Sequence, residues 1–163
     1  MKFAPTVSSF LLCALLFSTA WAADDAQVLP LVTCQDSWME WEKSSSKVDE
    51  FRKQFSANFK QTGRGASFAP NQPTTILGHR VNEVYPDSIG MGVGFSVLVD
   101  AQFDSVKASL ERQVGKALSK CSKEGDSRSC EYTFAEKKTL LLLEGGRGKS
   151  AQTLFGCYYF YAK

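Results

Sequence analysis

Cysteine is the residue type in this sequence that is most able to take part in chemistry, as a nucleophile, a metal ligand or half of a disulfide. The chain of 163 residues contains five cysteines and a single histidine. One histidine excludes a multi-histidine metal site, and the cysteines lack the C-x-x-C spacing typical of structural zinc sites. We therefore expect neither a metal nor a cofactor. Cys13 lies in an apolar N-terminal stretch, and the other four are Cys34, Cys121, Cys130 and Cys157.

Residues 1–22 have the features of a secretory signal peptide. A lysine precedes an apolar run over residues 10–17, and Ala20-Trp21-Ala22 fits an A-x-A cleavage site. The apolar run is too short to span a bilayer comfortably. Cleavage would remove Cys13 and release a soluble chain, residues 23–163, into the periplasm or outside the cell.

The four cysteines that remain predict two disulfides, because exported chains oxidise paired cysteines. Of the three possible pairings, we favour Cys121–Cys130 and Cys34–Cys157. The first would close a short polar loop over residues 122–129. The second would join the start of the domain to its last strand. Disulfide pairing also removes the most reactive nucleophile, since a catalytic cysteine needs a free thiol.

His79 is the one histidine that could act as a general base. We expect it in a strand, where it would serve a hydrolase with a nearby serine or acid. The sequence has no G-x-S-x-G nucleophile elbow, and the Gly-rich segment 144–150 lacks P-loop spacing. These observations leave the question of enzymatic activity open and favour a protein without it.

Three polar segments are candidate binding elements. The loop between Cys121 and Cys130 carries Asp126, Ser127 and Arg128 on a base that the disulfide would hold in place. Such preorganisation lowers the entropy cost of binding. The turn over residues 144–150 presents a further cation, Arg147, and the loop over residues 63–73 contains Arg64 and Phe68.

Two amphipathic helices are expected. One spans residues 103–118 with Asp104 as its N-cap. The other helix ends before residue 60. The run of serines over residues 44–46 allows a break in this helix, with Ser46 as the N-cap of its second part. Residues 23–33 before it are expected to form a loose leader. The apolar residues of the earlier helix recur at helical spacing and predict packing on a sheet: Trp38, Trp41, Val48, Phe51, Phe55 and Phe59.

Five strands are expected from alternation and turn residues. Residues 63–73 are expected to form a loop, because Pro70 and Pro73 lack the N–H that a strand ladder needs. Residues 139–143 are apolar at every position, which predicts a central strand buried on both faces, with a short buried helix as the alternative. The predicted strands cover residues 74–84, 91–99, 130–135, 139–143 and 153–161.

We therefore predict an α+β fold, with an antiparallel sheet of about five strands, two helices packed on one face, and two disulfides as staples. The net charge of +2 excludes a polybasic nucleic-acid binder. The expected function is that of an exported binding protein whose partner is another protein, such as a periplasmic inhibitor or immunity-type protein acting on a cell-envelope enzyme. The alternatives are an envelope hydrolase using His79, and an envelope assembly factor or ligand carrier using the aromatic C-terminal strand.

Overall fold

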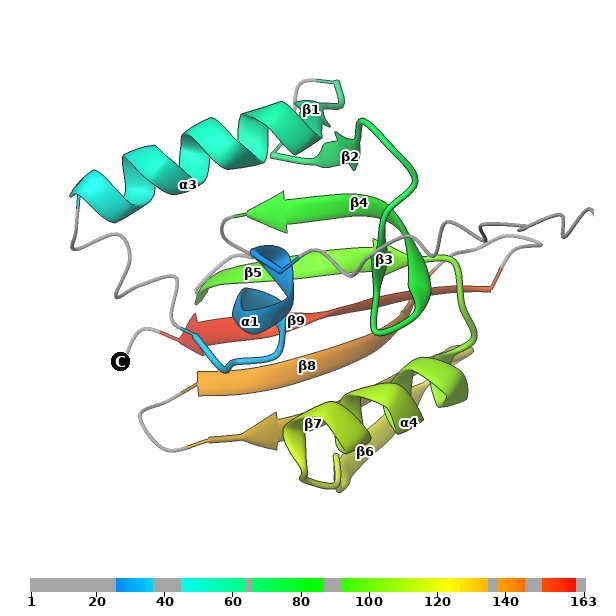
Figure 1. Ribbon diagram of the computed structural model, residues 1–163. Coiled ribbons are helices and arrows are strands. Elements are labelled where there is room, and N and C mark those ends of the chain that lie inside the picture. The colour runs from blue at the N-terminus through cyan, green and yellow to red at the C-terminus, as the bar shows by residue number, and fades with distance from the viewer. Residues whose placement is uncertain are drawn as a thin grey trace, which may run out of the picture.

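The computed structural model describes residues 26–36, 45–63, 66–86, 92–134, 138–145 and 151–160. In this part of the chain, three helices and one antiparallel sheet of nine strands form an α+β fold (Figure 1). The predicted fold class is confirmed. The helices are α1 (Val28–Val32), α3 (Ser45–Asn58) and α4 (Phe103–Val114). The strands are β1 (Phe59–Gln61), β2 (Phe68–Pro70), β3 (Thr75–Ile76), β4 (His79–Pro86), β5 (Gly92–Val99), β6 (Lys120–Glu124), β7 (Ser127–Thr133), β8 (Lys138–Gly145) and β9 (Gln152–Phe160).

The last of these strands lies in the middle of the sheet. The strand order is β1-β2-β4-β5-β9-β8-β7-β6, with β3 paired to β4 beside this path. On one side of β9, Tyr158 pairs with Gly94 of β5. On the other side, Cys157 pairs with Leu140 of β8. β9 therefore joins an N-terminal and a C-terminal half of the sheet.

One face of the sheet, here called the helix face, carries the core. The ring of Phe95 in β5 meets the rings of Phe51 and Phe55 in α3 at centroid distances of 5.8 and 6.1 Å. Figure 1 shows all three described helices on this side, as predicted for two of them. The register places the following buried side chains on the same face: Val84, Val93, Phe95, Val97, Val99, Cys130, Leu140, Leu142, Phe155 and Cys157.

Helix α1 occupies part of the segment expected to be a loose leader, so that expectation is wrong for residues 28–32. Val28, Leu31 and Val32 are buried, and α1 packs on β5 and β9. The segment is too short to show helical periodicity. Its order comes from tertiary packing and from Cys34, which follows it and bonds to Cys157.

The aromatic stripe of α3 packs on the sheet, as predicted. Phe51 and Phe55 stack at 5.3 Å between ring centroids, and Phe55 meets Phe68 edge-on at 5.1 Å. Ser46 lies inside the helix and does not cap it, since α3 begins at Ser45. Trp38 and Trp41 lie outside the described residues.

Helix α4 differs from the prediction at both ends. Its N-cap is Gln102, and Asp104 lies in the first turn. The helix stops at Val114 because Gly115 adopts a left-handed conformation, φ 65°, that closes the C-terminus. Leu118 therefore lies beyond the helix, where its N–H donates to Glu111 Oε1 at 2.8 Å.

The sheet has more strands than the five expected, because short strands flank the longer ones. The segment expected as strand 74–84 is a hairpin of β3 and β4, whose turn residues Leu77 and Gly78 have φ 55° and 76°. Positive φ at both positions is the geometry of a type I′ turn. The expected loop over residues 63–73 contains β2, in which Pro70 lies opposite Phe59.

The predicted central strand over residues 139–143 lies within β8, but its predicted burial on both faces is wrong for Leu141 and Leu143. Leu140 and Leu142 are buried on the helix face, whereas Leu141 and Leu143 are half-buried. The three described helices lie on the other side of the sheet from these two leucines. We call this second side the open face, and its central residues are Ser96, Leu98, Leu141, Leu143, Leu154 and Tyr158.

Both predicted disulfides are confirmed. Cys34–Cys157 joins the segment after α1 to β9 across 123 residues of sequence, and Cys121–Cys130 joins neighbouring positions of β6 and β7. The structure is thus anchored at the centre of the sheet and again near its edge.

Candidate functional site

The predicted binding loop between Cys121 and Cys130 is a β-hairpin, and not an irregular loop. Cys121 pairs directly with Cys130, and their Cα atoms are 4.1 Å apart. Gly125 turns the chain with φ 60°, and Asp126 and Ser127 are exposed beside it. Strand β6 was not predicted, because all five of its residues are exposed and the alternation of apolar and polar residues is absent.

Arg128 has a structural role in this hairpin. Its guanidinium makes two hydrogen bonds to Glu144, at 2.9 and 3.0 Å, and two to Asp104, both at 3.0 Å. The same group lies 4.5 Å over the ring of Phe103. Arg128 therefore connects β7 to β8 and to the first turn of α4. Its side chain is 36% exposed, and its charge is shared between two carboxylates.

The electrostatics of this cluster follow from the same contacts. Hydrogen bonding to Arg128 lowers the pKa of Glu144 below its ordinary value, and Arg128 itself has a raised pKa. Lys123 adds a smaller favourable charge near Glu144. Asp104 was expected to cap α4, but its carboxylate bonds to Arg128 instead.

Three other predicted elements have different outcomes. Arg147 and Arg64 lie outside the described residues. Phe68 packs against Phe55 and so belongs to the core. In the aromatic C-terminal strand, Tyr158 and Tyr159 are both buried, and Tyr159 donates its hydroxyl to the carbonyl of Asp36 at 3.3 Å.

His79 meets a serine from a distant part of the chain. Its Nε2 lies 3.2 Å from the Oγ of Ser109, which projects from α4. A hollow of about 210 Å³ adjoins this pair and is lined by Leu77, Ser109, Arg112 and Gln113. A serine hydroxyl hydrogen-bonded to an imidazole is the arrangement of nucleophile and general base, and Arg112 places a cation beside it.

The open face carries an apolar row that the strand predictions did not anticipate. Leu98 of β5 pairs with Leu154 of β9, which pairs with Leu143 of β8. All three are half-buried. None of the described helices covers this face, and the face of an antiparallel sheet that no helix covers ordinarily carries polar residues. The available signal was the run Leu140–Leu143, which is apolar at positions of both parities.

A hollow lies at one end of this leucine row. Its volume is about 490 Å³, and Leu98 and Gln152 contribute to it from β5 and β9. Beside it, the hydroxyl of Tyr85 donates to Glu83, and burial, together with this bond, raises the pKa of Tyr85 to about 12. The remaining lining residues are Ala69, Pro70, Arg80, Val81, Asn82 and Glu83.

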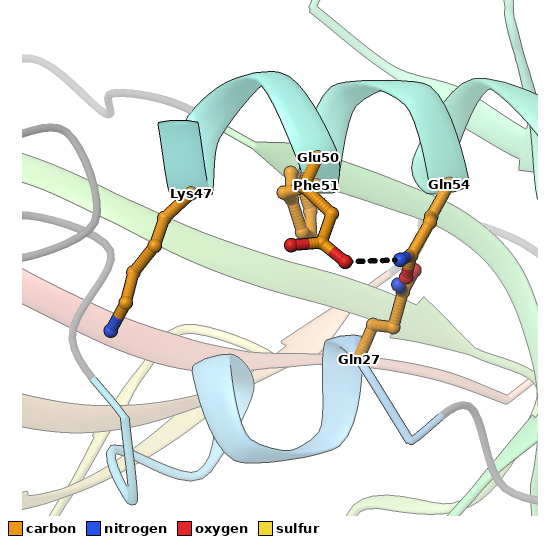
Figure 2. Close-up of a pocket in the computed structure, with 5 residues that line it drawn as sticks. All are labelled: Gln27, Lys47, Glu50, Phe51 and Gln54. Carbon is orange, nitrogen blue, oxygen red and sulfur yellow. Dashed lines mark hydrogen bonds between the residues drawn. The ribbon is translucent and has the colours of Figure 1, made fainter. Parts of the chain in front are cut away.

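A further hollow, of about 230 Å³, separates α1 from α3. Figure 2 shows Lys47, Glu50 and Gln54 extending from α3 toward α1, with Gln27 reaching up from α1 and Phe51 behind. Gln54 Nε2 donates to Glu50 Oε1 at 3.1 Å. The three polar side chains from α3 are exposed, so this hollow is a shallow seam between two helices, and we assign no ligand to it.

The described residues contain no group of three His, Cys, Asp or Glu side chains placed to hold a metal ion. Within the same residues, no helix has the length and apolar character needed to cross a membrane. Comparison with protein families, curated proteins and solved structures gives no match for this chain.

Proposed function

We propose that this protein is an exported binding protein without catalytic activity, of the inhibitor or immunity type, which blocks an enzyme of the cell envelope through its open face. The observation that carries the proposal is the leucine row Leu98–Leu154–Leu143 on that face. The three leucines are half-buried on a face that none of the described helices covers, and contiguous apolar surface that solvent reaches is a mark of an interaction site.

The surroundings of the row match the anatomy of a protein interface. Such interfaces have an apolar centre and a polar rim. Here the rim includes Glu83 at the hollow, and Glu131 and Lys120 toward the edge of the sheet, where an ion pair of 3.5 Å joins the last two. The hollow beside Leu98 provides a recess for one anchoring side chain of a partner, which is how hot-spot residues bind.

Export is supported by the two disulfides, because paired cysteines persist in oxidising compartments. The signal-peptide interpretation of residues 1–22 supports the same location. The hairpin turn with Asp126 and Ser127 is exposed and remains a second predicted contact. A target enzyme in the envelope is consistent with this location and with a domain built for binding.

The proposal can be tested with the oxidised chain spanning residues 23–163. We expect it to inhibit at least one peptidoglycan hydrolase of its source organism. Leu154→Glu and Leu143→Glu should each weaken inhibition by about tenfold or more, as expected for an interface centre. Ala57→Glu, on the exposed side of α3, is the matched control. Equal inhibition by Leu154→Glu and the unmodified protein would contradict the proposal.

The pair formed by His79 and Ser109 supports a second candidate, a small envelope hydrolase. Ser109 would be the nucleophile and His79 its base, at the observed 3.2 Å. This candidate predicts that a fluorophosphonate probe labels Ser109, and that His79→Ala abolishes labelling while thermal stability stays nearly unchanged. Labelling that is absent in the native protein, or that persists in Ser109→Ala, would exclude it.

A further inference from the structure

Among the described strands, β6 forms an edge of the sheet. It pairs with β7 on one side and ends the strand order on the other. In Figure 1 it lies at the lower edge of the sheet beside α4. All five of its residues, from Lys120 to Glu124, are exposed. An edge strand presents a row of N–H and C=O groups to which another strand can pair.

The pairing with β7 determines which backbone groups are available. Cys121 and Cys130 have Cα atoms 4.1 Å apart, which identifies the closely spaced, non-hydrogen-bonded type of antiparallel pair. The neighbouring residue Ser122 therefore exchanges its backbone hydrogen bonds with Ser129. The N–H and C=O groups of Cys121 and Lys123 consequently point away from β7, toward the open edge.

The edge is held firmly in position. The disulfide fixes β6 to β7, and Arg128 fixes β7 to β8 and α4 through four hydrogen bonds of 2.9 to 3.0 Å. A strand that is already ordered loses little entropy when it pairs. The edge is thus prepared to bind an extended segment without rearrangement.

We propose that the partner of this edge is β6 of a second copy of the chain, paired antiparallel about a two-fold axis at Ser122. This register places Lys120 opposite Glu124 of the second copy, twice by symmetry. Opposite charges across an antiparallel pair stabilise it, whereas like charges oppose it. A register centred on Lys123 would place two lysines opposite each other, and one centred on Cys121 would lose the pairing of opposite charges.

The backbone groups agree with this register. Cys121 of one copy lies opposite Lys123 of the other, so the outward N–H and C=O groups of both residues meet as hydrogen-bonded pairs. On the open face, Lys120 then lies between Glu131 of its own chain, at 3.5 Å, and Glu124 of the second copy. The two sheets join into one continuous sheet with isologous symmetry.

The first test is the oligomeric state of the oxidised chain spanning residues 23–163, measured by sedimentation velocity over a range of concentrations. We expect a reversible dimer. Lys123→Pro removes an N–H that the register points away from β7, so it should abolish dimerisation while preserving the pairing of β6 with β7. A monomer at every concentration, or a dimer unaffected by Lys123→Pro, would overturn the proposal.

Charge reversal tests the register and does not depend on the proline variant folding. Lys120→Glu and Glu124→Lys should each weaken association by about tenfold, because each converts two attractive pairs into repulsive ones. The double variant should restore association by exchanging the charges. Failure of the double variant to recover would overturn the register.

A cross-link provides a direct geometric test. Ser122→Cys places two thiols opposite each other at the two-fold axis, within disulfide range. It should form a covalent dimer much faster than Ser105→Cys, a control on the exposed side of α4. Peptide mapping should find Cys121–Cys130 intact. Equal cross-linking rates for the two variants would overturn the proposal.

Discussion

The ring of Tyr158 covers Gly94 on the neighbouring strand. A Cβ atom built at Gly94 would lie 2.4 Å from Tyr158 Cδ1 and 2.5 Å from the carbonyl oxygen of Cys157. On the next row, a Cβ atom at Gly156 would lie 2.3 Å from the carbonyl oxygen of Phe95. The two glycines thus allow β5 and β9 to pair while Tyr158 is buried on the open face.

The glycines should be sensitive to the smallest substitution. Gly156→Ala forces a methyl group against the backbone of β5 and should lower the free energy of unfolding by about 3 kcal/mol. Gly145→Ala is the matched control, because its nearest contacts would be 3.4 Å, and it should change stability little. Urea denaturation measures both. Equal stabilities for the two variants would contradict the prediction, because they would show that β5 and β9 accommodate a methyl group at Gly156 without loss of stability.

The two disulfides should differ in their contribution to stability. In the entropic model, closing the 123-residue separation of Cys34–Cys157 stabilises by roughly 2 kcal/mol more than closing the short Cys121–Cys130 loop. The paired replacements Cys34→Ala with Cys157→Ala, and Cys121→Ala with Cys130→Ala, can be compared by urea denaturation. A larger loss from the second pair would contradict the model and would indicate that the hairpin carries more of the native packing.

Arg128 should contribute to stability in a pH-dependent manner. Its bond lowers the pKa of Glu144 in the folded state from an ordinary value of 4.5, so the unfolded state takes up the proton first as the pH falls. The stabilisation is therefore complete above pH 4.5 and is lost as the pH falls through the lowered pKa.

Arg128→Ala should reduce the unfolding midpoint by about 2 to 5 °C near neutral pH, and by less in acid. Arg128→Lys is the control, since lysine retains the charge but cannot make the paired bonds. Thermal unfolding followed by circular dichroism at neutral and acidic pH is the measurement. A difference between native protein and Arg128→Ala that grew toward low pH would contradict the assignment.

Tyr85 should titrate late among the tyrosines. Its pKa is raised to about 12 by burial and by its bond to Glu83. Because the unfolded state loses this proton first, the contribution of Tyr85 to stability should fall as the pH rises from 10 toward 12. Ultraviolet titration of tyrosinate should show a late component that is smaller in Tyr85→Phe than in the native protein, because burial also raises the pKa of Tyr158. Glu83→Gln should shift it to lower pH, and an unchanged titration in Tyr85→Phe would refute the assignment.

The sequence was sufficient to predict the features that depend on local residue spacing or on an even number of cysteines. The even number of cysteines after the predicted signal peptide predicted both disulfides, and the spacing of Phe51 and Phe55 predicted a helix packed on a sheet. Helix α1 was missed because five apolar residues show no period, and its order depends on packing. Strand β6 was missed because an exposed edge strand has no buried side to produce alternation.

The candidate sites could not be predicted from the sequence in the same way, because each site combines residues that are far apart along the chain. Arg128 bonds to Asp104 and Glu144, which are 24 and 16 residues away, and nothing in the local pattern indicates that its charge is shared. The approach of Ser109 to His79 brings the start of β4 to α4, which packs on β8 and β9. The leucine row depends on the register of three strands, although the four consecutive leucines of β8 were already a sign that both of its faces are apolar.

The central position of β9 has a consequence for the order in which the protein can fold. The strands that pair with it, β5 and β8, are separated from each other until residues 152–160 are available. A chain that lacks these residues, or has not yet synthesised them, can form two half-sheets but cannot join them. Since both halves then expose unpaired edges, the sheet is complete only once β9 is present, and truncation before residue 152 would leave two separate half-sheets.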